Sequence, residues 1–185
     1  DFLSVVVVTG DGVFWSYDLV KDQPSPLAGT WRLDGAGVGP AADSREWFSI
    51  SRSSADDLAA RPCLFDDAFV FGEYGTFANQ MGDATWIEAW QDAAAGDGAC
   101  LTPIAPHDGG NDASFVYDEA AETLTLNGQG AHLGLAKVVN DAELGAPTAA
   151  PASITYTVTT FDSEFLSVVV VTGDGVFWSF DFAKQ

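Results

Sequence analysis

The segment Phe165-Leu-Ser-Val-Val-Val-Val-Thr-Gly-Asp-Gly-Val-Phe-Trp-Ser-Phe-Asp-Phe182 decides the expected fold. Its centre, Thr172-Gly-Asp-Gly175, supplies residues that tolerate the positive φ values of a hairpin turn. The flanking runs are rich in valine and aromatic residues, and alternate positions from Val176 to Phe182 place apolar side chains on one face. The segment therefore predicts a β-hairpin with one buried face.

This hairpin sequence occurs twice in the chain. Residues 2–16 recur letter for letter as residues 165–179, at an offset of 163 residues. Such a repeat is typical of a tandem array, and the two prolines within residues 22–26 favour an extended linker between units. We therefore expect residues 1–22 to be the terminal hairpin of a preceding repeat. Residues 23–185 would form one complete repeat unit, a β-barrel domain.

The first copy is surplus to that unit. It would expose its apolar face in the absence of the preceding unit, and this face comprises Val13, Trp15, Tyr17 and Leu19. A lone hairpin is marginal in water, so we expect residues 1–22 to promote association while contributing little to the unit's own fold. The partners would be neighbouring repeats or other copies of the chain, through pairing with an open sheet edge or through exchange with the twin hairpin.

The rest of the chain has mainly the periodicity of strands. Ile154 to Thr160 alternates apolar and polar residues, and further strands are expected at residues 29–33, 64–71, 75–79, 114–117 and 123–126. Short helices are expected at Ser54 to Ala60, with Ser54 as N-cap, and at Thr85 to Asp92. The predicted fold class is mostly β, an antiparallel β-barrel or sandwich with one or two short helices.

Composition excludes several classes of protein. The chain has 185 residues, of which 47% are apolar, which is enough for a sizeable core and excludes intrinsic disorder. Its net charge of −20 repels nucleic acids and anionic membrane surfaces, so neither is an expected partner. The longest run of branched apolar residues is far shorter than the roughly 20 residues of a membrane-spanning helix, so we predict no membrane span.

The cysteines, Cys63 and Cys100, lack the spacing of a zinc or redox motif. A single disulfide is the favoured state, with two unpaired buried thiols as the alternative. A disulfide would contribute roughly 3 to 4 kcal/mol through loop closure and would indicate a secreted or cell-surface protein.

Catalytic signatures are absent from the sequence. Residues 127–134 are glycine-rich but have Leu133 where GxGxxG needs its third glycine, and no phosphate loop, HExxH or GxSxG occurs. Only an acid pair among Asp66, Asp67 and Glu88 could serve a glycoside hydrolase. We therefore expect that the chain is not an enzyme.

Two acidic segments could hold a cation. Asp66 and Asp67 alternate along the expected strand, so one of them points into apolar surroundings, where it needs a partner. Three roles are open for this buried aspartate. It is a structural acid that pairs with Arg61 or accepts hydrogen bonds from loop N–H groups, or it is a calcium ligand, or it is a catalytic acid. The loop that follows His107 offers further oxygen ligands, namely Asp108, Asn111 and Asp112, although an acidic turn is the alternative. Ca²⁺ is the only cofactor predicted.

Aromatic residues form the second candidate site. On the expected helix Trp86 and Trp90 are four residues apart and share a face, with Glu88 on a different side. Flat indoles beside carboxylates suit sugar rings, whose faces are apolar and whose hydroxyls need hydrogen bonds. The predicted ligand-binding residues are Trp47, Trp86, Glu88, Trp90 and His107. In the alternative interpretation the helix plugs the barrel and both indoles belong to the core.

Two stretches carry family resemblances. Leu27-Ala-Gly-Thr-Trp-Arg-Leu33 resembles the first strand of lipocalin-like barrels, in which G-x-W starts the sheet. Residues 29–158 resemble an uncharacterised lipocalin-like β repeat domain of secreted marine bacterial multidomain proteins. That resemblance rests on Ala60-Arg-Pro-Cys-Leu-Phe-Asp-Asp67, Gly82-Asp-Ala-Thr-Trp-Ile-Glu-Ala-Trp-Gln91, Ala105-Pro-His-Asp-Gly109, Leu126-Asn-Gly-Gln-Gly-Ala-His-Leu-Gly-Leu135 and Ala150-Pro-Ala-Ser-Ile-Thr-Tyr156. It implies secretion and a multidomain context, and the two cysteines match those of the family, whereas Trp47-Phe48 replaces its Trp-Trp or Trp-Tyr pair.

The favoured function is a non-catalytic repeat module of a secreted or cell-surface multidomain protein, acting in adhesion or binding of a polysaccharide or other surface glycan. Repetition of weak modules raises avidity. The alternatives are a purely structural spacer repeat in an extracellular array and a lipocalin-like pocket for a small ligand.

Overall fold

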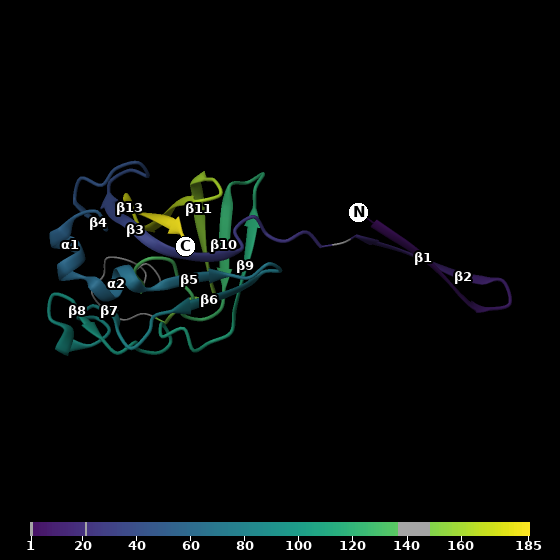
Figure 1. The fold of residues 1–185 in the computed structure, drawn as a ribbon, viewed down its shortest axis with the longest axis horizontal. Helices are drawn as coiled ribbons and strands as arrows, with labels where there is room; N and C mark the ends of the chain where they lie inside the picture. Colours follow the sequence, from purple (N-terminus) through teal and green to yellow (C-terminus); the bar gives the residue numbers. More distant parts are fainter. Residues whose placement is uncertain (1, 21, 137–148) are drawn as a thin grey trace.

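In the computed structural model, which describes residues 2–20, 22–136 and 149–185, eight antiparallel strands close into a barrel (Figure 1). In order of hydrogen bonding these strands are β3 (Gly29–Gly39), β13 (Val176–Lys184), β12 (Phe165–Gly173), β11 (Ser153–Phe161), β10 (Thr123–Asn127), β9 (Ala113–Asp118), β6 (Thr76–Gln80) and β5 (Ala68–Phe71). The barrel closes because β5 pairs with the first half of β3 while β13 pairs along its other edge. The predicted fold class is confirmed, as a barrel.

Smaller elements cover one end of the barrel (Figure 1). They are β4 (Phe48–Ser51), α1 (Ala55–Ala60), α2 (Pro62–Asp66), β7 (Thr85–Ile87), the 3₁₀ turn η1 (Ala93–Ala95) and β8 (Ala99–Leu101). β4 pairs with the second half of β3, and β7 pairs with β8 as a separate two-stranded sheet. The linker before β3 lies toward the opposite end.

Strand alternation fills the barrel. In β11, Tyr156 and Val158 are buried while the neighbouring threonines are exposed, as the strict pattern predicted. In β13, Trp178, Phe180 and Phe182 are buried together, and Phe182 meets Phe69 of β5 edge-on with ring centres 5.1 Å apart. These side chains belong to one continuous apolar cluster inside the barrel.

The helix at residues 54–60 is confirmed. The Ser54 side chain accepts a hydrogen bond from the backbone N–H of Asp57, which satisfies one of the N–H groups that a helix start leaves free. The strand predicted at residues 64–71 is wrong in part. Residues 64–66 are helical because Pro62, at the first helical position, starts α2, and the strand begins only at Ala68.

The helix predicted at residues 85–92 is absent. Residues 85–87 form β7 instead, since Thr85 and Ile87 are β-branched, and both point inward while Trp86 is half-buried. Backbone hydrogen bonds from Gln91 and Asp92 to Glu88 then make a turn. Trp86 and Trp90 therefore do not share a helical face.

The N-terminal hairpin, β1 (Phe2–Gly10) and β2 (Val13–Val20), forms a sheet of its own and lies apart from the barrel (Figure 1). Val13, Trp15 and Tyr17 are exposed, as predicted; the side chain of Leu19 lies outside the described residues. The assignment of this hairpin to a preceding repeat stays a prediction.

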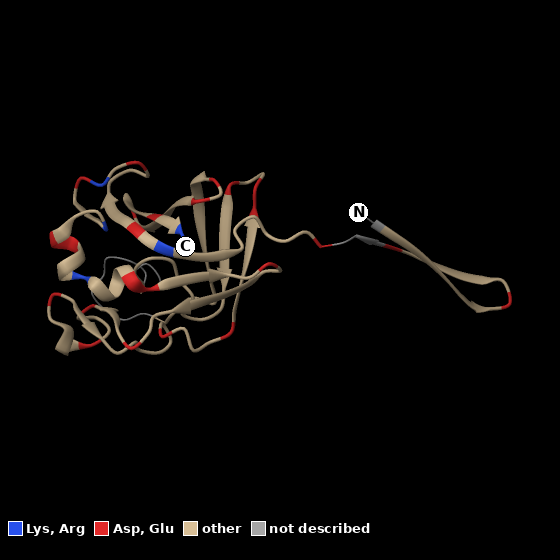
Figure 2. Cartoon of the chain, viewed as in Figure 1, with Lys and Arg blue, Asp and Glu red and all other residues tan. Residues whose placement is uncertain are grey.

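Acidic residues lie on loops and strand ends around the barrel, with few Lys or Arg between them (Figure 2). Within the described ranges, no helix has the length and apolar character needed to cross a membrane.

Candidate functional site

A partly open cavity of about 250 Å³ lies beneath the elements that cover one end of the barrel. Its volume is just below the roughly 300 to 1,000 Å³ of most ligand pockets. It is lined by Val38, Phe48, Ile50, Arg61, Leu64, Trp86, Glu88, Asp97, Leu135 and Trp178. The lining therefore draws on β3, β4, α2, β7 and β13, and two of its residues are carboxylic acids.

The cavity has an apolar floor and an aromatic rim. Val38, Ile50, Leu64 and Trp178 are buried, so they form a floor continuous with the barrel core. Phe48, on the exposed side of β4, leans against Trp178 with ring centres 6.1 Å apart. An apolar group entering the cavity would meet aromatic carbon on more than one side.

Arg61 places a positive charge in this wall. It is both the C-cap of α1 and the N-cap of α2, so two helix ends fix its backbone. Its guanidinium carbon lies 4.8 Å from the ring centre of Trp86 and 5.6 Å from that of Phe48, within cation–π distance of both. Asp57 is 4.0 Å from the guanidinium. Arg61 therefore bridges the two aromatic sides of the rim.

Glu88 is held at the cavity by Trp90. The indole Nε1–H of Trp90 donates to Glu88 Oε2 at 2.9 Å, and the same indole packs edge-on against His107 at 5.6 Å between ring centres. A carboxylate has two oxygens, so it can accept more than one hydrogen bond. The turn after β7 thus aims an acceptor at the cavity.

The structure brings four of the five predicted ligand-binding residues together. Trp86 and Glu88 line the cavity, while Trp90 and His107 lie behind Glu88. Trp47 is 54% exposed beside the rim residue Phe48 and does not line the cavity. The ligand-binding role of these residues stays a prediction.

Two histidines lie deeper at the same end. His107 and His132 line a small enclosed space, with ring centres 6.0 Å apart. Burial lowers the pKa of both, that of His132 to about 4, and His132 Nδ1 lies 2.9 Å from the carbonyl oxygen of Gly130. His107 Nε2 is buried without a hydrogen-bond partner. Both rings are therefore neutral at pH 7.

This burial predicts acid sensitivity. The folded pKa of His132 lies below the unfolded value of 6.5. The stability that the neutral ring contributes to the fold is therefore intact above pH 6.5 and is lost as the pH falls toward 4. We expect the ring resonances of His132 in an NMR titration to keep the neutral-form shift down to about pH 5. A midpoint near 6.5 in the folded protein would contradict this expectation.

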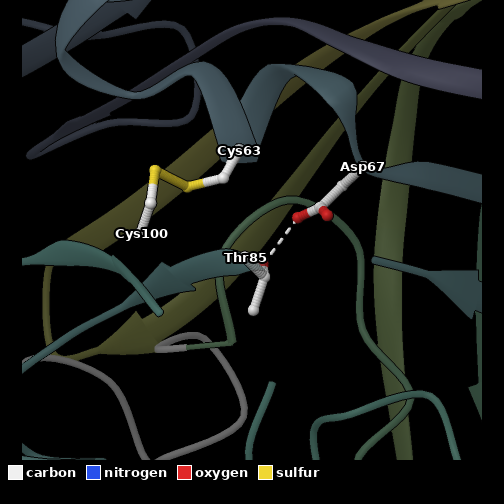
Figure 3. The surroundings of a disulfide bond; sticks show 4 residues. All are labelled: Cys63, Asp67, Thr85 and Cys100. Carbon is white, nitrogen blue, oxygen red and sulfur yellow. Dashed lines mark hydrogen bonds between the residues drawn. A yellow bond between two sulfur atoms is a disulfide. The ribbon is translucent and has the colours of Figure 1, made fainter. Parts of the chain in front are cut away.

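Asp67 lies beside the only disulfide of the chain (Figure 3). Thr85 Oγ1–H donates to Asp67 Oδ2 at 2.6 Å, whereas Oδ1 is buried without a partner. Desolvation raises the pKa of Asp67 to about 8, against the lowering effects of the Thr85 hydrogen bond and the charge of Arg32. Of the alternatives for this acid, the pairing with Arg61 is wrong, since Arg61 contacts Asp57 and the aromatic rim.

The predicted calcium ligands fall in different settings. Asp66 is exposed while its neighbour Asp67 is buried, and Asp108 accepts the backbone N–H of Gly110 in a turn. Asn111 donates to the carbonyl oxygen of Gln129, and Asp112 is exposed. Among the residues that the structure describes, no group of three or more His, Cys, Asp or Glu side chains could hold a metal ion. Calcium binding stays a prediction.

Fold and site together define a small closed β-barrel with an aromatic-rimmed cavity at one end. No family model matches the chain, and no curated protein matches it.

Proposed function

We propose that the chain is a non-catalytic glycan-binding module of a secreted or cell-surface protein. The observation that carries this proposal is the combination of side chains around one cavity, with aromatic faces at Trp86 and Phe48, a cation at Arg61 and carboxylates at Glu88 and Asp97. Sugar rings present apolar faces and many hydroxyls, so they suit aromatic surfaces bordered by hydrogen-bonding groups. The small volume fits a terminal sugar residue of a longer chain.

The position of the cavity supports a repeated module. The cavity lies at the end of the barrel covered by the helices, whereas the linker joins toward the opposite end. A neighbouring unit attached through the linker would leave the cavity accessible. Several such modules in a row would multiply a weak affinity by factors of about 10² to 10⁴.

The cavity proposal predicts a loss of binding on removal of the Trp86 ring. In affinity electrophoresis against a panel of marine and cell-surface polysaccharides, we expect retardation of the wild type and at least a tenfold weaker affinity for Trp86→Ala, about 1.4 kcal/mol. Glu88→Gln, which keeps an acceptor for the Trp90 N–H, should weaken binding to a smaller degree. Tyr74→Ala, at an exposed aromatic residue between β5 and β6, is the matched control and should bind like the wild type.

Two results would contradict the proposal. Absence of retardation on every polysaccharide would favour a purely structural spacer. Equal losses for Trp86→Ala and Tyr74→Ala would show that binding occurs away from the cavity.

A further inference from the structure

The two copies of the repeated sequence form the same hairpin. Every Cα pair of β1 and β2 has its counterpart 163 residues later in β12 and β13, including the irregularity before the turn. Ser4 Oγ–H donates to Asp18 at 2.5 Å, and the corresponding Ser167 donates to Asp181 at 2.7 Å. The N-terminal copy therefore has the shape of the hairpin that closes the barrel.

Only the C-terminal copy, β12–β13, is part of the barrel. β12 pairs with β11 and β13 pairs with β3, and the apolar face of this hairpin is covered by the barrel. Trp178 is 4% exposed, whereas its counterpart Trp15 is 56% exposed. The N-terminal hairpin thus presents an apolar face whose complement exists in the same chain.

The polar contacts that anchor the closing hairpin are also encoded in the first copy. Arg45 forms an ion pair with Asp181 at 2.7 Å, and its Nε–H donates to Ser179 Oγ at 2.8 Å. The first copy has Asp18 and Ser16 at the matching positions. It therefore carries both the apolar face and the two groups that Arg45 binds.

The linker is long enough for exchange within one chain. The end of β13 lies beside the start of β3, because Lys184 pairs with Trp31 and the Gln185 N–H donates to the Thr30 carbonyl at 2.9 Å. Lys21 is the sequence counterpart of Lys184. With Lys21 at that position, residues 22–28 would form the loop back to the start of β3 at Gly29, across a strand spacing of about 5 Å. Seven extended residues span up to about 24 Å, so this loop is not strained.

From these contacts we infer that β1–β2 is a spare closing hairpin for the barrel of its own chain. It enters the position between β11 and β3 when β12–β13 leaves it. In a tandem arrangement, a hairpin between two barrels could then close the barrel before it or the barrel after it. The docking surface is the β1–β2 hairpin with its apolar face, and the partner on which it docks is the pair of strand edges on β11 and β3.

Two sequence differences make β12–β13 the preferred occupant. The first copy has Tyr17 at the position of Phe180, whose side chain has no exposed surface. After exchange, the Tyr17 hydroxyl would therefore need a hydrogen-bond partner in the core. The first copy has Leu19 at the position of Phe182, so the exchanged barrel would lack the edge-on contact between Phe182 and Phe69. The spare hairpin therefore closes the barrel less tightly than its twin.

The test uses the full chain and four forms of it: wild type, Phe180→Asp, Tyr17→Asp and the double variant. A carboxylate at either position excludes that hairpin from the core. We expect Tyr17→Asp to melt like the wild type, Phe180→Asp to retain a cooperative transition at a lower temperature, and the double variant to lose it. Equal loss of the transition in Phe180→Asp and the double variant would overturn the inference.

A cysteine pair locates the exchanged hairpin. Val169 pairs with Thr157, so its counterpart Val6 would lie opposite Thr157 after exchange. In the Phe180→Asp chain we expect Val6→Cys and Thr157→Cys to form a disulfide within a single monomer under mild oxidation, identified by peptide mass mapping. A cross-link between two chains, or none, would overturn the assignment to the barrel of the same chain.

Discussion

A chain in which serine replaces both Cys63 and Cys100 is expected to lose about 4 kcal/mol of its free energy of unfolding. The two residues form a disulfide in the structure, as the sequence favoured, and are 37 residues apart. Closing a loop of this length in the unfolded chain is worth about 4 kcal/mol, which the double serine variant gives up. For a chain of this size the melting temperature should fall by on the order of 10 °C.

Thermal and urea unfolding without reductant measure this loss. Reduction of the wild type should reproduce the same shift, which controls for packing changes caused by serine. A loss below about 1 kcal/mol in both experiments would contradict the expectation. Because the disulfide joins α2 to β8, the partner strand of β7, the variant should also bind glycan more weakly through a looser Trp86.

The barrel could be predicted because its strands have a simple period. β11, β12 and β13 have nine residues each, alternation marks one apolar face in β11 and β13, and the duplicated turn marks the hairpin of β12 and β13. The strands that were missed, β4 and β8, have four and three residues, too few for alternation to be visible. The helical spacing of Trp86 and Trp90 favours a helix over residues 85–92, whereas Thr85 and Ile87 are the inward-pointing residues of a strand, β7.

The site could be predicted only where its residues are close in sequence. Trp86, Glu88 and Trp90 stood out as aromatic and acidic residues in one short segment. Phe48 and Trp178 come from strands more than 100 residues apart, and their contact follows from barrel closure, which no local pattern encodes. Arg61 is one of the partners that the sequence offers for the buried aspartate, yet the cap between α1 and α2 turns its side chain toward Trp86.

The burial predicted for one of the two neighbouring aspartates is correct, but the strand from which it is predicted is not present at these residues. Strand alternation predicted that one of Asp66 and Asp67 would be buried, and Asp67 is 3% exposed. Asp66 is exposed, however, because it ends α2, while Asp67 is the residue that follows the helix. The partner of Asp67, Thr85, lies in the segment that the sequence predicts to be helical, so no sequence pattern links the two residues.

Replacing Asp67 by asparagine is expected to stabilise the protein increasingly as the pH rises. The folded pKa of about 8 lies above the ordinary value of 3.8, so the stability associated with the protonated carboxyl is present below about pH 4 and is lost as the pH rises toward 8. A change of one in pKa is worth about 1.4 kcal/mol, which makes the full effect on the order of 5 kcal/mol. Asparagine cannot ionise, and its side-chain oxygen can still accept the Thr85 hydroxyl.

Urea unfolding of the wild type and of Asp67→Asn at pH 4.5, 6, 7.5 and 9 measures this effect. The difference between the two free energies should grow through this series and level off above pH 8. Asp174→Asn is the matched control, since Asp174 is exposed in the turn between β12 and β13 and its charge is not among the causes of the Asp67 shift, so its curve should follow the wild type. A difference between Asp67→Asn and the wild type that does not change with pH would mean that water or Arg32 keeps the Asp67 carboxylate ionised within the fold.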